Sequence, residues 1–335
     1  MSGKIKLYIA ETAHPTAKNE PWRNIDLDRL RKAAIKYDGE VFSVCNNPKK
    51  SDMILFSGDM GPHLEFVRIS KLYRKYRNKC FVFSAEGKAI KFVRGLYASI
   101  EGKEYSEKLY RGGFYLIDEH IKAKEEVTNP KYLYSFVGSI DTSETRTKLL
   151  KLNRKDSPIV DVSGKVSEAW ANYEDETEKK KLIDSYISSI LNSKFVLCPR
   201  GYNCSSIRLF ESMKLGRAPV IISDEWTSPI GPDWDSCSVR INERDILKIP
   251  VLLKERENEW KDLGESAKET WEKYFSDTGA LETITKSCSD IAKYKSPSRC
   301  MNNLRCYYNS IRSGRFKYYI RTRINLYKEF KKLYL

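Results

Sequence analysis

Arginines and serines that could bind phosphate lie close together in LCPRGYNCSSIRLFESMKLGRAPVII, residues 197–222. The segment runs from an apolar stretch through a Pro-Arg-Gly turn into a predicted helix, and a second apolar stretch follows Gly216. Guanidinium groups such as those of Arg200 and Arg208 bind phosphate oxygens through paired hydrogen bonds, and serine hydroxyls add further hydrogen-bond donors. These residue types in this order indicate a site for a phosphate-bearing ligand.

The helix predicted over residues 207–215 would strengthen such a site at its first turn. Ser205 or Ser206 is a natural N-cap residue, and Gly216 is a natural residue for the end of the helix. The first turn of a helix leaves backbone N–H groups unpaired and carries roughly half a positive charge. Arg200 lies just before this turn and Arg208 just inside it, so a diphosphate could be bound there.

Glu211 follows Arg208 by three residues and therefore lies on the same face of the predicted helix. A carboxylate there could accept hydrogen bonds from both hydroxyls of a ribose. A diphosphate at the start of the helix and a ribose one turn along would together be a nucleoside diphosphate. The alternative is an ordinary capped helix with a surface Arg208–Glu211 pair, which contributes about 0.3–0.5 kcal/mol.

The elements that would position these residues are strands alternating with helices. We expect strands at 4–10, 51–59, 80–84, 132–139, 157–164, 195–198 and 218–223, and helices at 26–37, 63–76, 145–152, 179–192 and 207–215. This rhythm favours an α/β protein of two Rossmann-like domains facing a cleft, with ligands beyond the carboxyl ends of the strands. The predicted boundaries are 1–128 for an acceptor domain, 129–290 for a sugar-donor domain and 291–335 for a basic helical tail.

Most of the net charge of +15 lies in the tail. Residues 291–335 contain twelve Lys or Arg and one acidic residue, which leaves a net charge of +4 for the rest of the chain. The apolar residues Phe316, Ile320, Ile324, Tyr327, Phe330 and Tyr334 recur every three or four positions among these basic residues. Such a helix fits an anionic membrane surface, or it could pack back on the body of the protein.

The remaining composition is typical of a folded intracellular protein. The N-terminal MSGKIKLYIAE lacks the apolar core of a signal peptide, and no stretch approaches the roughly 18 apolar residues of a membrane span. We expect the protein in the cytoplasm, or peripherally on the cytoplasmic face of a membrane. The eight cysteines match no zinc-site spacing, so we expect reduced and mostly buried thiols.

Residues 193–224 closely resemble the most characteristic block of the exostosin-like glycosyltransferases (glycosyltransferase family 47). The shared features are a strand, C-P-R-G, a loop with serine, R-x-x-E, and G-x-x-P-V-I-I. YSFVGS (134–139) with Arg146, and SVRINERDI (238–246), resemble two further elements of the family's donor domain. The strong likeness covers residues 132–250, whereas the N-terminal half is similar only in its alternation of strands and helices.

The resemblance implies the GT-B arrangement, a UDP-sugar substrate and inversion at the sugar without an essential metal or other cofactor. Arg200 and Arg208 would bind the diphosphate, Ser205 and Ser206 would add hydrogen bonds, and Glu211 would bind the ribose. Gly201 would also belong to the site for the sugar nucleotide. Gly138 would keep the strand end clear, with Arg146 nearby. The acceptor would be a glycan or glycolipid in the synthesis of a surface polysaccharide, a lipopolysaccharide or a glycoprotein glycan.

An inverting transfer also needs a general base from the N-terminal domain. Residues that follow predicted strands there are candidates: Glu86, Asp59 and His63, with Glu11 and His14 as a third option. Two other functions stay open at this point. YLYSFVGS and SPIVDVSG also resemble fucosyltransferases that use a GDP-sugar, and the basic tail could bind nucleic acid, although we expect no nucleic-acid partner.

Overall fold

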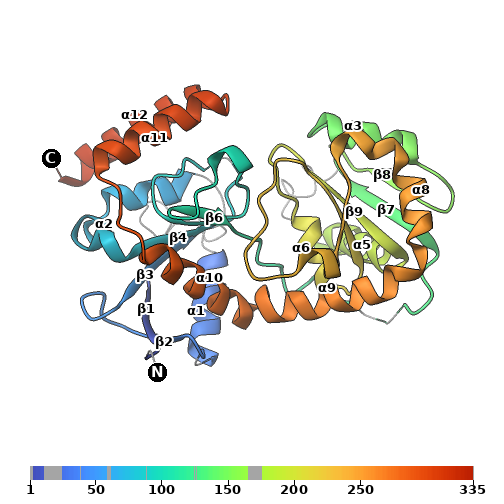
Figure 1. The fold of residues 1–335 in the computed structure, drawn as a ribbon, viewed down its shortest axis with the longest axis horizontal. Helices are drawn as coiled ribbons and strands as arrows, with labels where there is room; N and C mark the ends of the chain where they lie inside the picture. Colours follow the sequence, from blue (N-terminus) through green and yellow to red (C-terminus); the bar gives the residue numbers. More distant parts are fainter. Residues whose placement is uncertain are drawn as a thin grey trace. The chain divides into compact units, whose positions relative to one another are not determined.

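The computed structural model describes residues 3–10, 25–37, 39–58, 62–87, 89–123, 125, 127–164 and 176–334. The chain divides into two compact units. Unit 1 comprises Met1–Phe114, Thr227–Ile230 and Asp277–Leu335, and unit 2 comprises Tyr115–Trp226 and Gly231–Ser276. Each unit contains a parallel sheet with helices, which confirms the predicted α/β class of two Rossmann-like units (Figure 1).

The sheet of unit 1 has the strand order β2-β1-β3-β4-β5-β6 among the described residues. Its strands are β1 (Ile5–Ile9), β2 (Phe42–Val44), β3 (Met53–Gly58), β4 (Cys80–Ser84), β5 (Gly95–Tyr97) and β6 (Tyr110–Gly112). β3 and β4 are buried along their whole length, as continuous apolar runs in a parallel sheet are expected to be. The order reverses between β1 and β3, and the segments after these strands, 11–24 and 59–61, lie outside the described residues.

The helices of unit 1 come from both ends of the chain. They are α1 (Ile25–Lys36), η3 (Pro62–Ile69), α2 (Lys71–Tyr76), η4 (Arg77–Lys79), η5 (Gly102–Glu104), α10 (Asp277–Ala292), α11 (Arg299–Arg312) and α12 (Phe316–Tyr334). Helices α1 and α10 contact one another and strands β3 and β5, respectively. Residues of η3, α2, α11 and α12 share one buried apolar cluster with β3 and β4.

The sheet of unit 2 has the order β11-β10-β9-β7-β8. Its strands are β7 (Tyr132–Gly138), β8 (Ile159–Asp161), β9 (Ser193–Pro199), β10 (Ala218–Ile222) and β11 (Val239–Arg240). All the pairs are parallel, so the carboxyl ends of the strands lie at one edge. In chain order this is the 2-1-3-4-5 arrangement, whose direction reverses between β7 and β9. Sheets of this order bind ligands at that reversal.

Most of the described helices of unit 2 are short, and α5 is the longest of them. They are α3 (Glu144–Leu149), η6 (Leu150–Leu152), α5 (Glu176–Leu191), α6 (Ile207–Lys214), α7 (Trp234–Cys237), η7 (Glu243–Lys248), α8 (Ile249–Glu255), η8 (Glu257–Glu259) and α9 (Trp260–Tyr274). Gly216, two residues after α6, has φ +67°, the left-handed conformation expected of a glycine that ends a helix.

The unit boundaries differ from those expected, and besides the short segment Thr227–Ile230, which belongs to unit 1, two differences are larger. Unit 2 begins at Tyr115 instead of residue 129, and α10 belongs to unit 1 although it was expected in the sugar-donor domain. Contacts with the N-terminal part of the chain explain the second difference. Asp277 pairs with Arg29 at 2.6 Å, and the Glu282 carboxylate accepts hydrogen bonds from the backbone N–H groups of Glu40 and Val41.

The segment 63–76, expected as one helix, forms the two helices η3 and α2. They are separated at Ser70, whose hydroxyl accepts a hydrogen bond from the N–H of Tyr73 at 3.1 Å and so caps α2. A side chain that caps a new helix replaces the bonds that would continue the old one. The apolar spacing of Phe66, Ile69 and Leu72 did not reveal this break.

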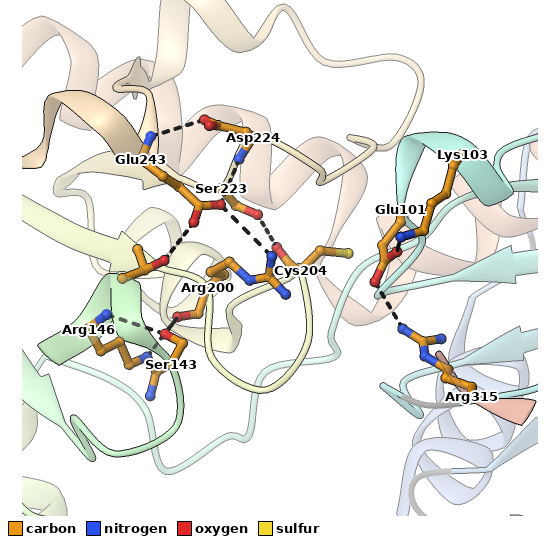
Figure 2. Close-up of polar contacts among 11 residues, drawn as sticks. Glu101, Lys103, Ser143, Arg146, Arg200, Cys204, Ser223, Asp224, Glu243 and Arg315 are labelled. Carbon is orange, nitrogen blue, oxygen red and sulfur yellow. Dashed lines mark hydrogen bonds and ion pairs between the residues drawn. The ribbon is translucent and has the colours of Figure 1, made fainter. Parts of the chain in front are cut away.

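The tail forms a pair of contacting helices, α11 and α12 (Figure 1). Tyr319, Thr322 and Leu326 are the buried residues of α12, and Tyr319 and Leu326 belong to the apolar cluster of unit 1. At the start of α12, Arg315 pairs with Glu101 at 3.1 Å, and Figure 2 shows this contact. In the apolar stripe singled out in the sequence, Phe316, Ile320, Ile324 and Tyr327 are 38–60% exposed. Phe330 of this stripe is half-buried, and the side chain of Tyr334 lies outside the described part of the chain.

All eight cysteines are free thiols, and six of them are buried, as the sequence analysis predicted. Burial raises the pKa of Cys198 to about 12, which makes this thiol, two residues before Arg200, a poor nucleophile. In the part of the chain that the structure describes, no helix is both long enough and apolar enough to cross a bilayer.

Candidate functional site

The arginines of the motif lie where the strand order of unit 2 reverses. β7 ends at Gly138, and β9 ends at Pro199, immediately before Arg200. Helix α6 begins at Ile207 after the connecting loop, which places Arg208 in its first turn. The strand topology therefore brings Gly138, Arg200 and Arg208 to the edge at which such sheets bind ligands.

The Arg208 side chain is buried, with 7% of its surface exposed, and reaches from α6 to β7. Its Nη2 donates a hydrogen bond to the carbonyl oxygen of Val137 at 2.5 Å. The guanidinium stacks on the ring of Phe136 at 4.4 Å and lies 5.8 Å from the ring of Tyr186. Its Nε and Nη1 are buried and have no hydrogen-bond partner among the described residues. Two unsatisfied cationic donors at one position are suited to an anion.

Gly138 makes room for this arginine. A Cβ atom added at Gly138 would lie 2.5 Å from Nη2 of Arg208 and 3.0 Å from Cζ of Phe136. The sequence analysis expected this glycine to keep the strand end clear for the ligand itself. In the structure, the space is filled by the guanidinium that would contact the ligand.

Arg200 is held through its backbone, while its side chain is less constrained. Its carbonyl oxygen accepts hydrogen bonds from Ser143 Oγ at 2.9 Å and from Arg146 Nε at 3.1 Å (Figure 2). Nη1 of Arg200 lies 4.0 Å from Oε1 of Glu243. Nε is buried without a hydrogen-bond partner in the described part of the chain. Arg200 therefore offers a second cationic donor that a bound anion could satisfy.

Glu243 connects the loops that follow three strands of this sheet. Its Oε2 accepts a hydrogen bond from Thr145 at 2.6 Å, and its Oε1 accepts one from the N–H of Asp224 at 3.2 Å. The N–H of Glu243 donates to Asp224 Oδ1 at 3.1 Å, and Figure 2 shows these contacts around Arg200. This network fixes the Glu243 carboxylate beside Arg200.

Arg146 contacts the backbone around Arg200, and its guanidinium nitrogens donate to carbonyl oxygens there. Its guanidinium donates to the carbonyl oxygens of Ser139, Arg200 and Pro199 at 3.1–3.4 Å. Burial, with a smaller contribution from Arg208, lowers the pKa of Arg146 to about 10. A Cβ atom at Gly201 would lie 3.1 Å from Nη2 of Arg146, so Gly201 provides space for this side chain. The role of both residues is to shape the loop that carries Arg200.

The loop before α6 supplies neutral polar groups. Ser206 occupies the N-cap position of α6, with extended backbone angles, but its hydroxyl makes no capping hydrogen bond. This buried hydroxyl and the buried Oδ1 of Asn203 have no hydrogen-bond partner among the described residues. Ser205, the other predicted cap, is buried beside it. The Ser206 hydroxyl and the N–H groups at the start of α6 could therefore bind an anion.

Glu211 is buried one turn after Arg208 and contacts Tyr186 of α5. The Tyr186 hydroxyl donates to Oε2 of Glu211 at 2.5 Å. Burial raises the pKa of Glu211, although the bond from Tyr186 and the charge of Arg208 act in the opposite direction. Burial and the Glu211 charge together raise the pKa of Tyr186 well above its usual value. Tyr186 thus links Arg208 and Glu211 through its ring and its hydroxyl.

The structure describes only some of the general-base candidates of unit 1. Glu86 follows β4 at the carboxyl edge of its sheet and is half-buried, and its N–H donates to Ser84 Oγ at 3.2 Å. His63 lies in the first turn of η3, and only its backbone is described. Asp59, Glu11 and His14 lie outside the described residues.

The sequence analysis assigned no role to Tyr186, Ser143, Thr145 or Glu243. Glu243 lies in the quoted element SVRINERDI, so its position was noted although its partners were not. Ser143 and Thr145 flank the start of α3, where Ser143 is the N-cap residue. Tyr186 lies on a helix whose apolar pattern suggested only core packing.

Comparison with known proteins agrees with the resemblance read from the sequence. Residues 116–256 match the exostosin GT47 domain. The exostosin-1 homolog of Caenorhabditis elegans is 32% identical over 156 residues, which are 43% of this chain and 41% of that protein. Exostosin-1 of Drosophila melanogaster is 26% identical over 289 residues, 82% of this chain and 37% of that protein. The predicted similarity to the exostosin family is confirmed.

The chain spans about two fifths of the length of these two relatives. Among solved structures, a glycosyltransferase from Rickettsia africae ESF-5 is similar over 88% of this chain and 100% of its own, with 12% identity and a TM-score of 0.42. The matched region, residues 116–256, contains every residue of the site described above in unit 2.

Proposed function

We propose that this chain, which matches the exostosin GT47 domain over residues 116–256, is an inverting glycosyltransferase that uses a UDP-sugar. The observation that carries the proposal is the pair of arginine side chains at the reversal of the unit 2 sheet, the buried Arg208 and the half-buried Arg200. Arg208 and Arg200 both have guanidinium nitrogens without hydrogen-bond partners among the described residues. Charged donors buried in this way are costly unless an anion binds them.

The diphosphate would bind between Arg200, Arg208 and the start of α6. Arg208 is held by Phe136 and Val137, so its remaining donors Nε and Nη1 are already oriented. The hydroxyl of Ser206 and the first N–H groups of α6 would add hydrogen bonds, with Ser205 beside them. A rigid guanidinium that is oriented before binding loses little entropy when the phosphate arrives.

The ribose would lie one turn further along α6, at Glu211. Oε2 of Glu211 accepts the hydrogen bond from Tyr186, so a ribose hydroxyl would bond to Oε1 or replace Tyr186. In this proposal, Gly138, Arg146 and Gly201 act indirectly, because they make room for or support the arginines.

The chemistry follows from where negative charge develops. In an inverting transfer, the acceptor hydroxyl attacks the anomeric carbon of the sugar while the bond between that carbon and the diphosphate oxygen breaks. The leaving UDP gains negative charge, which Arg200, Arg208 and the helix N-terminus would stabilise without an essential metal. The acceptor proton passes to a general base from unit 1, for which Glu86, Asp59 and His63 are the candidates.

The acceptor would be a glycan or glycolipid, and the proposed location is an anionic cytoplasmic membrane surface. The supporting observation is the exposed apolar stripe of α12, formed by Phe316, Ile320, Ile324 and Tyr327. Basic residues Lys317, Arg321 and Lys328 are also exposed on this helix. Such a helix can insert its apolar side chains while its charges contact lipid phosphates.

The test is an assay of UDP release from common UDP-sugars, combined with a competition between UDP and GDP for binding. Release of UDP, with UDP as the better competitor, supports the proposal. Preferential binding of GDP would instead favour a fucosyltransferase-like enzyme. If folded protein binds neither nucleotide but shows salt-sensitive binding to RNA or DNA, the transferase proposal is wrong.

A further inference from the structure

Unit 1 contains a cavity of about 220 Å³ to which the proposed transfer reaction assigns no role. Residues of η3, α2, η4, α11 and α12 line it. Four of the lining residues are arginines, Arg68, Arg77, Arg299 and Arg323, and none of the lining residues is acidic. The cavity therefore concentrates positive charge.

The arginines have neutral partners only. Arg68 donates to Asn303 Oδ1 at 2.8 Å and stacks on Phe92 at 4.6 Å. Arg77 donates to the carbonyl oxygen of Pro297, and Arg323 lies 3.5 Å from the same Asn303 oxygen. Within the described ranges, none of the four forms an ion pair with a carboxylate. Contacts with the protein orient Arg68, Arg77 and Arg323 but do not neutralise their charges.

This arrangement is unfavourable without a counterion. Arg68 and Arg77 are half-buried, whereas Arg299 and Arg323 are exposed. Burial lowers the pKa of Arg68, and the charge of Arg323 contributes in the same direction. Arginine does not lose its proton in proteins, so an anion in the cavity would offset the repulsion between these charges.

The other walls restrict what the anion can be. Ile69, Leu326 and Phe330 provide apolar surface, and Tyr73 and Tyr327 complete the lining. The volume is below the roughly 300–1,000 Å³ of pockets that enclose drug-sized ligands, so a whole nucleotide would not be enclosed. A phosphate or diphosphate group fits the volume, and several guanidinium groups match its oxygens.

We propose that this cavity binds a phosphate group, supplied by an anionic lipid or by a soluble phosphate compound. Tyr327 both lines the cavity and belongs to the exposed apolar stripe of α12. A lipid phosphate in the cavity would therefore have an apolar surface beside it for its chains. The inference concerns unit 1 and does not depend on the sugar-transfer reaction proposed for unit 2.

The experiment compares two pairs of substitutions with equal loss of charge. The cavity pair is Arg299→Gln with Arg323→Gln, at exposed positions where folding should be retained. The matched control pair is Arg154→Gln with Arg312→Gln, which are exposed in unit 2 and on α11, respectively, and do not line the cavity. Both pairs also carry Arg208→Ala, so that the site in unit 2 contributes little phosphate binding.

Two probes separate the sources of the phosphate. Inorganic pyrophosphate is titrated by calorimetry, and vesicles of phosphatidylcholine with or without phosphatidic acid are tested by co-sedimentation. We expect the cavity pair, but not the control pair, to weaken binding of at least one probe tenfold or more. Loss of pyrophosphate binding alone identifies a soluble phosphate compound, and loss of binding to phosphatidic acid alone identifies a lipid phosphate. If the two pairs behave alike with both probes, or neither probe binds the Arg208→Ala parent, the inference is wrong.

Discussion

Arg208 occupies the space that a side chain at Gly138 would need. The guanidinium crosses from α6 to the end of β7, where it bonds to the carbonyl of Val137. A Cβ atom at Gly138 would come within 2.5 Å of Nη2 of Arg208. Two segments about 70 residues apart in the chain therefore depend on one another. The glycine is needed for the position of the arginine, and the arginine for the proposed phosphate contact.

Gly138→Ala should weaken UDP binding about tenfold, because the added methyl group displaces the guanidinium. Gly138 does not have a positive φ, so the alanine backbone itself is unstrained. Overpacking of this kind costs about 1–3 kcal/mol of stability, so the thermal unfolding midpoint should fall as well. The control is Gly102→Ala, where no heavy atom lies within 4 Å of the added Cβ. Unchanged UDP affinity in a folded Gly138→Ala protein would contradict this role.

Glu243→Gln should weaken UDP binding several-fold if the carboxylate acts by positioning Arg200. The opposite sign is expected if Glu243 simply repels the phosphates, because removing its charge would then strengthen binding. A double-mutant cycle with Arg200→Ala separates the two effects by calorimetry. We expect Glu243→Gln to have almost no effect on UDP affinity when Arg200 is already alanine. Additive effects would show that Glu243 does not act through Arg200.

Burial of Glu211 predicts a pH dependence of stability. Its pKa is raised in the folded protein, so the folded state binds this proton more tightly than the unfolded state does. The contribution to stability is complete below the unfolded pKa, ordinarily about 4.5, and is lost as pH rises through the raised folded value. Glu211→Gln should therefore gain stability relative to the wild type as the pH rises from about 4.5 towards neutrality.

The measurement is the difference in unfolding midpoint between the two proteins across this pH range. Comparing the variant with the wild type removes the effects of carboxylates whose pKa is lowered, such as Glu101 and Asp290. Glutamine can still accept the hydrogen bond from Tyr186, so the change isolates the charge. A difference that does not change with pH would contradict the expected titration of Glu211.

The exposed stripe of α12 should govern binding to anionic vesicles. Deletion of residues 313–335 would not test this cleanly, because Tyr319 and Leu326 belong to the buried cluster of unit 1. Ile320→Ser with Ile324→Ser removes exposed apolar surface and leaves the charge unchanged. We expect vesicle binding to fall about tenfold with a nearly unchanged unfolding midpoint. Ile35→Ser with Val44→Ser, also exposed in unit 1, should leave vesicle binding unchanged.

The strands, and the strand-turn-helix connection that carries Arg200 and Arg208, could be predicted from the sequence because their signals are local. β4 matches the expected segment, and β10 is one residue shorter than expected, since apolar runs between turn residues define buried strands. The residues of the motif come together because the strand-turn-helix connection is continuous in the chain. Short strands such as β5 and β6 carry too little pattern to be recognised.

What depends on distant pairing could not be predicted. The position of α10 in unit 1 follows from Arg29 and Glu40, more than 200 residues away. The buried face of α12 could not be identified because Tyr319 and Leu326 differ little in type from the exposed Ile320 and Ile324. The roles of Gly138 and Tyr186 required knowledge of where the Arg208 side chain lies.

The most direct test of the proposed sugar-nucleotide site is calorimetric titration of UDP into the wild type and Arg208→Ala. The wild type should bind UDP, and the dissociation constant of the variant should be at least tenfold higher, since a charged hydrogen bond contributes about 1.5–3 kcal/mol. Arg154→Ala, at an exposed arginine of unit 2, should retain the wild-type constant. Equal constants for wild type and Arg208→Ala, or no binding of UDP to the folded wild type, would contradict the account.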